Sequence, residues 1–598
     1  MVNRLTKLRL RRVFRRRRKQ VVQIGENTEQ QLEKHLIKRL IRLPNIQRFL
    51  IGWIGLLLVV SIGLVLQTRA LGGKYQTLQP KPGGTYTEGI IGTFTNANPL
   101  YASSAVDSSV SRLVFSGLLK QDKDNKLIGD LAESWSIDEK ELVYTVKLKP
   151  NLQWHDGKPL TSKDVIFTYQ QIQNPETKSY LLSSWKGIKF EAPDLNTVVF
   201  KLPNSLSSFP YSLTNGIVPE HILASVEPSQ LRSTSFNNVD PVGSGPFRFS
   251  KVEVASEATD KRQERIALSA FDNYHEGRPK IDTFIIRTFA SEPNLITEFA
   301  DHKINAMVGL SALPDQFRDD TSVLEFGVPL NGEVMVFFKT TQEVLKDPAV
   351  RKALVLSTNK KDILDQLPYP LLSIDGPLLK SHIGYDKSYA QVTGKPEEAK
   401  KNLDAAGWVV DPATGIRAKA GVKLSFKLSS RMSSEYSSVA GSLQKQWRDI
   451  GVDMQVELQN DKDLQSTLAL HNYDALLYGI SVGSDPDVFP YWHGSQADAS
   501  SATVFNFSEY NSVVANQALE GGRTRSDAQL RSIKYKPFLE AWRNDAPALA
   551  LYQPRFLYVA RAPLYGLENN TSVNDATDRF THVERWTIRQ GLQSSVAK

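Results

Sequence analysis

The sequence contains a run of twenty residues, 49–68, that carries no charged side chain, and fifteen lysines and arginines precede it. Twenty helical residues span about 30 Å, which is the thickness of the hydrocarbon core of a bilayer. Because cationic segments stay on the cytoplasmic side, the N-terminus is predicted to be cytoplasmic and everything after Arg69 extracytoplasmic. The run therefore predicts a single-pass anchor in the cell membrane, with the main body at the cell surface or in a periplasm.

A cleavable signal peptide is the alternative interpretation of this run. Signal peptides have an apolar region of about 7–15 residues, a short basic leader and a cleavage site between small residues. Here 48 residues precede the apolar run, and Thr68-Arg69-Ala70 is a poor match to such a site. These features favour an uncleaved anchor, although cleavage stays open.

The positive charge of the chain is confined to the segment before the anchor. The whole chain has a net charge of +9, whereas residues 1–48 alone carry +12 and the rest carry −3. A nearly neutral body does not indicate a nucleic-acid-binding protein. In the predicted cytoplasmic tail, the cationic block 11–19 and a basic amphipathic helix over 27–43 are expected either to bind anionic lipid headgroups or only to set the topology.

The chain contains no cysteine. This excludes disulfides, thiolate metal sites, cysteine nucleophiles and attachment through a lipid-modified cysteine. A polar linker rich in glycine and proline, 69–84, is predicted to connect the anchor to the body.

Strand-like and helix-like segments alternate in the third quarter of the body. Strands are predicted at 424–428, 452–458 and 473–478, and helices at 433–450 and 462–471. Such alternation is typical of a parallel sheet, in which ligands bind beyond the carboxyl ends of the strands. The loop that follows Tyr478 is therefore a candidate binding site on topology alone.

This loop also contains a pattern found in serine hydrolases. Gly479, Ser481 and Gly483 match the spacing of a nucleophile elbow, which must run directly into a helix. Here the chain continues as Ser-Asp-Pro-Asp, which predicts a loop. His493 is too close in sequence to act as the usual later base, and only His582 is left. A hydrolase is thus the least favoured interpretation, and we expect no catalytic residue.

Asp485 and Asp487 suggest a calcium site, but the remaining ligands of a calcium-binding loop are missing at their required spacing. Asp-Pro-Asp is more often a rigid turn. We therefore expect no metal and no cofactor.

Several segments, taken together, resemble one family. They occur in order over nearly all of 84–570, at 131–135 (LAESW), 142–170, 241–253 (PVGSGPFRFSKVE), 347–364, 399–408, 473–489 and 545–554. Each is a weak match alone. As a set they resemble the family 5 solute-binding proteins, which are the extracytoplasmic receptors of peptide-type ABC importers.

This resemblance implies an α/β fold of the periplasmic-binding-protein type (class II), with two lobes and an extra subdomain. In this chain the fold follows the one transmembrane helix predicted from the apolar run. It also implies a receptor that is not an enzyme, in which the lobes close around a peptide and the closed form docks on permease subunits served by a cytoplasmic ATPase. The expected divisions of the body are lobe I at 85–130, 240–320 and 558–598, the subdomain at 131–239, and lobe II at 321–557.

The resemblance also indicates where ligand contacts lie. In peptide-binding members, the loop before Asp-Pro carries a tryptophan and an aspartate that pairs with the amine of the ligand. In this sequence those positions hold Gly479 and Val482, which puts free-amine peptides in doubt. Further candidate ligand contacts are Asp485 and Asp487 as substitutes, Tyr491 and Trp492 as a stacking wall, and Asn96 and Asn98 after the first strand of the body.

Two alternative hypotheses keep the predicted fold. In the first, the ligand is an oligosaccharide or another small polar solute. In the second, the protein is a receptor that signals through its basic tail and does not take part in transport.

Overall fold

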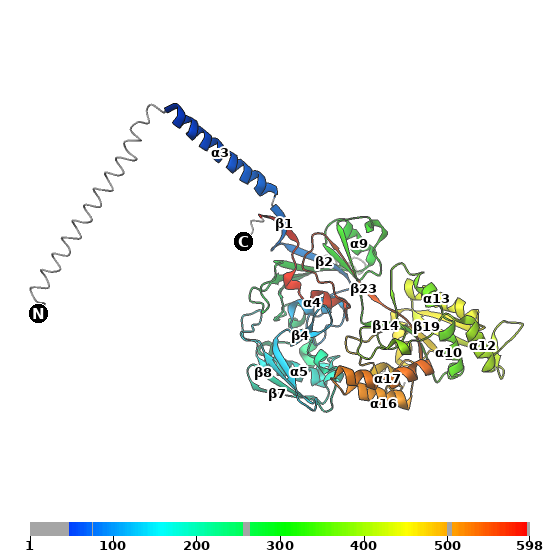
Figure 1. Ribbon diagram of the computed structural model, residues 1–598. Helices are drawn as coiled ribbons and strands as arrows, with labels where there is room; N and C mark the ends of the chain where they lie inside the picture. Colours follow the sequence, from blue (N-terminus) through cyan, green and yellow to red (C-terminus); the bar gives the residue numbers. More distant parts are fainter. Residues whose placement is uncertain (1–46, 75, 255–262, 499–504, 595–598) are drawn as a thin grey trace, which may run out of the picture. The chain divides into compact units, whose positions relative to one another are not determined.

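The computed structural model describes residues 47–74, 76–254, 263–498 and 505–594 (Figure 1). The chain divides into two units, the body Pro80–Arg589 and a second unit made of Met1–Gln79 and Gln590–Lys598.

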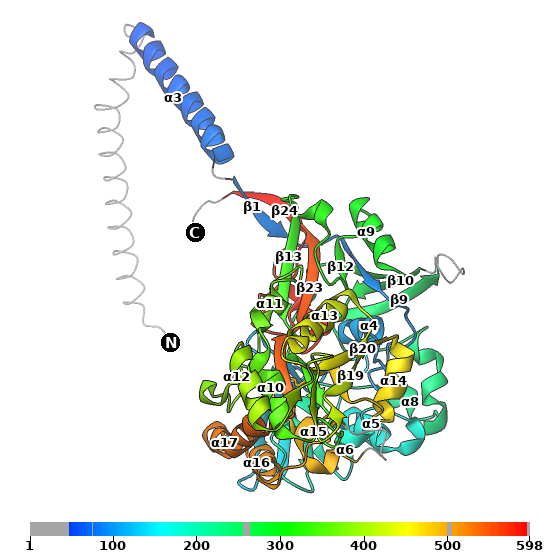
Figure 2. The same cartoon turned by 90° about the vertical axis from the view of Figure 1, so that its right-hand side faces the viewer.

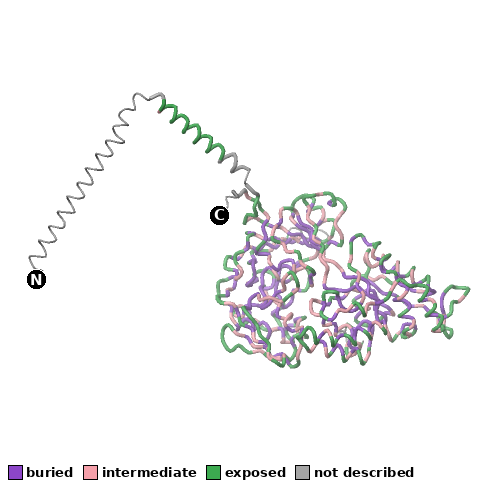
Figure 3. The backbone as a smooth tube through the Cα atoms, in the orientation of Figure 1, coloured by how far each residue is buried: buried purple, intermediate pink, exposed green. Residues whose placement is uncertain are grey.

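The second unit contains the predicted anchor. Helix α3 (Gln47–Lys74) includes the apolar stretch Phe49–Gln67, none of which is buried. Among the described residues it is the one helix long and apolar enough to cross a membrane. Figure 3 shows it exposed along its described length. The predicted cationic block and amphipathic helix lie outside the described residues.

Most residues of the predicted linker 69–84 have regular secondary structure. Helix α3 continues to Lys74, and β1 (Gln76–Lys81) then pairs with β24 (Arg589–Ser594) in a two-stranded sheet. Pairing gives the backbone N–H and C=O groups of both segments protein partners.

Lobe I is built on a seven-stranded sheet with the order β13-β23-β12-β2-β11-β10-β9. The strands are β2 (Thr85–Ile91), β9 (Phe247–Val254), β10 (Glu264–Ala270), β11 (Thr283–Phe289), β12 (Ala306–Val308), β13 (Val323–Pro329) and β23 (Arg555–Arg561). Strand β2 lies in the centre, parallel to β11 and β12. Helix α4 (Ala105–Val114) packs in the core on one face, and α9 (Glu292–Ala300) packs in the core on the other.

The extra subdomain is an antiparallel sheet with the order β5-β6-β8-β7. Its strands are β5 (Ala132–Ile137), β6 (Val143–Leu148), β7 (Lys189–Asp194) and β8 (Thr197–Lys201). Helix α5 (Ser162–Gln173) packs against it, and Thr161 and Asp164 form a capping box at its start. The subdomain shares one apolar core with lobe I. A short hairpin, β3 (Leu119–Gln121) and β4 (Leu127–Gly129), precedes it.

Lobe II is built on a six-stranded sheet with the order β15-β22-β14-β21-β19-β20. The strands are β14 (Gly332–Phe338), β15 (Leu372–Ser373), β19 (Ser425–Arg431), β20 (Asp453–Gln459), β21 (Ala475–Ser481) and β22 (Ala548–Gln553). Strand β19 is parallel to β20 and β21, which confirms the predicted parallel segment.

Helices cover both faces of the lobe II sheet, with a separate apolar core on each face. One core takes in α10 (Pro348–Ser357), α12 (Pro396–Ala405) and α13 (Ser434–Arg448). The other takes in α14 (Asp461–Ala469), α15 (Phe489–Trp492), α16 (Val513–Arg523) and α17 (Ala528–Asp545). Smaller elements are α6 (Leu182–Trp185), α7 (Phe209–Ser212), α8 (Glu220–Leu223), α11 (Lys360–Leu364), β16 (Val409–Val410), β17 (Arg417–Lys419) and β18 (Val422–Lys423).

The chain crosses between the lobes twice, and the two crossings lie together. Strand β13 leads into β14, and β22 leads back into β23; Figure 2 shows β13 and β23 side by side. The amide of Leu330 donates to the carbonyl of Pro554 (2.8 Å), and Gln553 Nε2 donates to the carbonyl of Leu330 (2.8 Å). The boundaries expected for lobe II, 321–557, are therefore wrong at both ends. The reason is that an alternating strand suits either sheet, and long-range pairing decides which one it joins.

Candidate functional site

The loop after β21 is attached to the crossing between the lobes. The amides of Val482 and Gly483 both donate to the carbonyl of Asn331, at 3.0 and 3.1 Å. Asn331 lies between β13 and β14, at the first crossing. The carboxyl end of β21 therefore lies where lobe I and lobe II meet. That the loop after it binds a ligand stays a prediction.

Ser484 connects this loop to lobe I through hydrogen bonds. Its hydroxyl lies 2.7 Å from Gln121 Oε1 and 2.9 Å from Asn574 Oδ1. Asn331 Nδ2 donates to both Ser484 Oγ (3.1 Å) and Asn574 Oδ1 (2.9 Å). Four polar side chains from the two lobes thus form one hydrogen-bonded group.

Asp485 and Asp487 are held by arginines of the α16–α17 hairpin. The Asp485 carboxylate accepts two hydrogen bonds from the guanidinium of Arg531. Asp487 Oδ2 accepts one from Arg523 Nη2 (2.9 Å), and burial raises the pKa of Asp487 while the arginine opposes that shift. Both carboxylates fix the loop to lobe II. A direct ligand contact by either one stays a prediction.

The turn between α16 and α17 contacts the subdomain. It is a second contact of lobe II, in addition to the contact of Ser484 with lobe I. The amide of Ser526 donates to Glu141 Oε2 (2.9 Å), and its hydroxyl donates to Glu141 Oε1 (2.6 Å). The amide of Ser207 donates to the carbonyl of Arg523 (2.9 Å). Figure 1 shows the hairpin next to the subdomain. The lobes therefore touch at the crossings and again at this turn.

Val482 and Trp492 are core residues of lobe II. Both are buried in the same apolar cluster, and the Trp492 ring stacks on Phe337 with centroids 5.6 Å apart. Tyr491 is only partly buried, and its hydroxyl donates to the carbonyl of Ser481 (2.6 Å). Tyr491 and Trp492 therefore have different surroundings, and they do not form one stacking wall as a pair.

Gly479 and Tyr491 meet at one pocket, a cavity of about 260 Å³ on lobe II, here called the aromatic pocket. It is lined by Gln465, Leu468, Ala469, Tyr478, Gly479, Ile480, Ser481, Tyr491, Phe505 and Phe507. At Gly479 a Cβ atom would lie 2.9 Å from the Tyr436 hydroxyl, so any larger residue would displace that tyrosine.

Asn96 and Asn98 lie in lobe I, apart from this loop. Asn98 is fully buried; its Nδ2 donates to Asn237 Oδ1 (3.0 Å), and its Oδ1 accepts from the Leu100 amide (3.0 Å). Asn96 Oδ1 accepts from the amide of Asn98 (2.8 Å). Both side chains shape the loop after β2. A ligand contact at either one stays a prediction.

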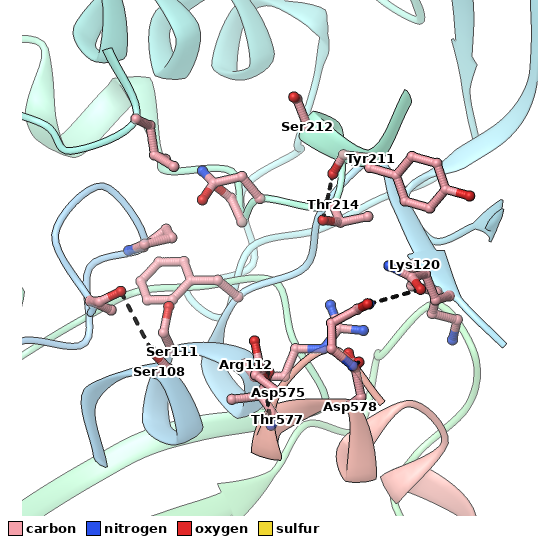
Figure 4. A pocket seen from close by; sticks show the side chains of 18 of the residues that line it. Ser108, Ser111, Arg112, Lys120, Tyr211, Ser212, Thr214, Asp575, Thr577 and Asp578 are labelled. Carbon is pink, nitrogen blue, oxygen red and sulfur yellow. Dashed lines mark hydrogen bonds between the residues drawn. The ribbon is translucent and has the colours of Figure 1, made fainter. Parts of the chain in front are cut away.

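Lobe I contributes a larger polar cavity of about 320 Å³ (Figure 4). Its charged lining side chains are Arg112, Lys120, Asp575 and Asp578. Burial, with Asp575 beside it, raises the pKa of Asp578. Gln121 and Asn574, which bind Ser484, also line this cavity.

Sequence reasoning missed the residues of this polar cavity. Most of them come from α4, β3, α6, the segment 211–216 and the segment 574–578, which are brought together only by the fold. Neither of the two numbered segments carries a local motif. The one sequence signal for this cavity was the polar run at 574–578, and such runs are too common in loops to identify a binding site.

The hydrolase arrangement predicted as an alternative is not assembled. Ser481 is the last residue of β21, and the loop 482–488 follows it in place of a helix. Among the described residues no histidine hydrogen-bonds to its side chain. His493 instead contacts Ser495 and Glu520, and His582 contacts Glu584.

One further group of side chains has metal-ligand chemistry. Asp130, His275 and Glu276 present ligand atoms within 4.8 Å of one another, and Glu276 forms a second such group with His582 and Glu584. The Lys120 ammonium lies 2.5 Å from Glu276, and His275 Nε2 lies 2.8 Å from Asp130. Glu276 is therefore already paired with a lysine, and Asp130 is already hydrogen-bonded to a histidine ring.

The family model for bacterial extracellular solute-binding proteins, family 5, matches residues 126–501, which is more than half of the chain. The oligopeptide-binding protein AppA of Bacillus subtilis (strain 168) is 27% identical over 490 residues, covering 80% of this chain and 87% of the relative.

Solved structures agree with this match. The structure of AppA from Bacillus subtilis with a nonapeptide covers 86% of this chain and all of its own, at a TM-score of 0.69 and 25% identity. NikZ from Campylobacter jejuni with Ni(L-His) covers 84% of this chain and 99% of its own, at 0.70 and 26%. The substrate-binding protein CtaP from Listeria monocytogenes covers 85% and 100%, at 0.72 and 23%, and shows the fold.

Proposed function

Because this chain belongs to the bacterial extracellular solute-binding proteins of family 5, we propose that it captures peptides between its lobes outside the cytoplasm and delivers them to the permease of an ABC importer. It is a binding protein, and the process it serves is transport.

The arrangement of the two crossings supports this role. The chain passes between lobe I and lobe II at two neighbouring crossings, near Leu330 and Pro554. Two adjacent strands can absorb a rotation that opens and closes the lobes. The contact of Ser484 with Gln121 and Asn574 would form on closure and break on opening. This contact across the lobes is the observation that carries the proposal.

The relatives support a peptide as the ligand. AppA is named an oligopeptide-binding protein, and its solved structure holds a nonapeptide. Extended peptides are bound through their backbone hydrogen-bonding groups, which suits a space with polar side chains on the lobe I side. The polar cavity beside Gln121 and Asn574 is the proposed lobe I part of this space.

Helix α3 is proposed to remain as the membrane anchor, with residues 1–48 in the cytoplasm. Tethering raises the effective concentration of the receptor near its permease, so a captured ligand has a short path to the transporter. The basic tail would add contacts with anionic lipid headgroups.

A small polar solute is the second candidate ligand. NikZ, at 26% identity, holds a complex of nickel with a single amino acid, and the polar cavity of about 320 Å³ suits a small charged solute. Val482 keeps this candidate open, because it stands where peptide-binding members are expected to carry an aspartate.

The test is native mass spectrometry of the whole chain purified in detergent, followed by thermal melts with defined peptide pools. A ligand at 100 times its Kd adds about 2.7 kcal/mol to the stability of the folded state. Co-purified peptide masses and a peptide-dependent rise in Tm are expected. Melts that respond to amino acids, metal chelates or sugars, and to no peptide, would replace the peptide proposal with the second candidate.

A further inference from the structure

Glu141 of the subdomain accepts two hydrogen bonds from one residue of lobe II, the amide and the hydroxyl of Ser526. Ser205 of the subdomain supports the same contact, because its Oγ lies 3.2 Å from Glu141 Oε2 and 3.1 Å from the carbonyl oxygen of Thr524. Hydrogen bonds to an ionised acceptor are about twice as strong as those between neutral groups. Glu141 therefore supplies a charge-assisted link between the subdomain and lobe II.

The whole contact between the subdomain and the α16–α17 turn, here called the seam, is polar. It also includes the bond from the Ser207 amide to the Arg523 carbonyl (2.9 Å), and Ser208 Oγ lies 3.4 Å from Asp487 Oδ2. No apolar cluster of the described residues takes in both sides of the seam. Hydrogen-bonded groups exchange their partners for water when they separate, whereas permanent interfaces are more apolar. This composition is that of a reversible contact.

Two polar atoms of the seam are buried without a hydrogen-bond partner among the described residues. They are Ser207 Oγ and Arg523 Nε. Burying a polar group without a partner costs at least as much as one hydrogen bond contributes. The closed seam therefore gains from the bonds at Glu141 and loses at these two atoms. A small net difference between two states is what allows a ligand, or the loss of one bond, to shift the equilibrium between them.

The turn that carries Glu141 is fixed by its own hydrogen bonds. Asp138 Oδ1 accepts from the amides of Leu142 and Val143, both at 2.7 Å, and the Glu141 amide donates to the carbonyl of Asp138 (3.0 Å). Glu141 has a φ of 57°, in the left-handed region that residues other than glycine seldom adopt. Such conformations persist where the surroundings impose them, and they are frequent at switching contacts. The position of Glu141 is thus set before Ser526 meets it.

The seam lies away from the crossings between the lobes. Figures 1 and 2 both show α16 and α17 apart from β13 and β23, the strands that flank the crossings. When one lobe rotates about the crossings, each point moves in proportion to its distance from the axis. The bonds at Glu141 therefore break at an early stage of opening.

We propose that Glu141 is a positioning residue of the closed form: it bonds to Ser526 when the lobes close on a ligand, and it slows their reopening without contacting the ligand. The proposal rests on the proposed function and adds how the closed form is held. Glu141 lines neither the polar cavity nor the aromatic pocket. Its effect on release should therefore be the same for every ligand that the lobes enclose.

The first test measures the seam directly in the whole chain, purified in detergent. The chain has no cysteine, so Lys140→Cys and Arg525→Cys place one spin label on an exposed residue at each side of the seam. Without ligand we expect two distances between the labels, and a nonapeptide pool should shift the population to the shorter one. Glu141→Gln, which keeps the shape and removes the charge, should lower the ratio of short to long distances by about tenfold.

The second test measures the rates of peptide binding and release by stopped flow. Glu141→Gln should speed the release of each bound peptide by about tenfold and leave the association rate and the Tm of the unliganded protein nearly unchanged. A residue that only stabilised the fold would lower that Tm and would not separate the two rates. A ligand contact would affect some peptides and spare others.

Two further variants separate the carboxylate from the turn. Glu139→Gln changes an exposed glutamate of the same turn and should behave like the wild type in both tests. Glu141→Gly suits the left-handed φ and removes the side chain, so it should reproduce the effects of Glu141→Gln. Wild-type behaviour of Glu141→Gly would assign the contact to the backbone and overturn the role of the carboxylate.

A label distance that neither the nonapeptides nor Glu141→Gln changes would identify the seam as a fixed contact and overturn the inference. An unchanged release rate in Glu141→Gln would overturn it as well, while peptide binding stands. If no peptide binds, the proposed peptide function fails. The label distances of the wild type and of Glu141→Gln then still decide whether Glu141 holds the lobes together.

Discussion

Arg531 and Asp485 form a two-point ion pair inside lobe II, with Nη1 and Nη2 donating to the two carboxylate oxygens at 2.8 and 2.7 Å. The side chains are only 3% and 9% exposed. The pair connects helix α17 to the loop that follows β21. It holds this loop in the position from which Ser484 reaches lobe I.

Asp485→Asn is expected to destabilise the body by about 3–5 kcal/mol, because it leaves the Arg531 guanidinium buried without its counter-charge. Urea unfolding measures the change. The matched control is Asp461→Asn, which breaks an exposed ion pair with Arg431 and should cost far less. Equal losses in the two variants would contradict a structural role for the buried pair.

Ser484→Ala is expected to speed ligand release without much change in Tm. The hydroxyl contributes to the contact between the lobes, and one net hydrogen bond is worth about 1 kcal/mol, or about fivefold in a rate. Stopped-flow release of a bound peptide measures it. Ser466→Ala, on an exposed face of α14, should behave like the wild type. An unchanged release rate in Ser484→Ala would mean that this contact does not hold the closed form.

His155 and His382 are expected to make the protein less stable in mild acid. Burial lowers the pKa of each to about 4. In the unfolded chain each binds a proton near pH 6.5. The unfolded state therefore takes up protons first, and stability falls by about 1.4 kcal/mol per pH unit for each histidine as the pH drops from 6.5 towards 4.

The hydrogen bonds of these rings agree with neutral imidazoles. His382 Nδ1 accepts from the amide of Leu379 (3.3 Å), and its Nε2 donates to the carbonyl of Gly483 (2.9 Å). Urea unfolding at pH 7, 6 and 5 gives the slope, and His382→Gln should make it shallower. Ring NMR signals of His155 and His382 that titrate near pH 6.5 would rule out this origin of the acid sensitivity.

The topology can be tested with single cysteines, because the chain has none of its own. Lys140→Cys, in an exposed turn of the subdomain, should react with a membrane-impermeant maleimide added to intact cells or spheroplasts. Asn27→Cys should react only after the membrane is permeabilised. Loss of the N-terminal segment from the mature protein, seen by mass, would instead identify residues 49–68 as part of a signal peptide.

Local periodicity predicted much of lobe II. The strands expected at 424–428, 452–458 and 473–478 correspond to β19, β20 and β21, displaced by a few residues at their ends. Alternation at period two and at 3.6 is a property of neighbouring residues, so the printed sequence contains it. The sheet to which β13 belongs is decided by pairing with β23, more than 200 residues later, and no local pattern encodes that choice.

The candidate site also combines features that the sequence predicts with features that only the fold decides. Topology predicted that the loop after β21 is a candidate binding site. The partners of its two carboxylates lie 36 and 46 residues further on, on α16 and α17, so their ion pairs could not be foreseen. Glu333 stands at the start of the apolar run GEVMVFF, and no nearby residue indicates that it is fully buried with no hydrogen-bond partner among the described residues.

The placement of β23 has a consequence for the order in which the chain can acquire its structure. All of β14 to β22 lies between β13 and β23, so lobe II is one uninterrupted insertion in lobe I. Strand β23 fills the gap between β13 and β12. During synthesis and export, the first 554 residues can complete lobe II, whereas lobe I must wait with an open sheet until the last strand arrives. The half-finished lobe I is then the stage at which exported chains most need protection from strand-to-strand aggregation.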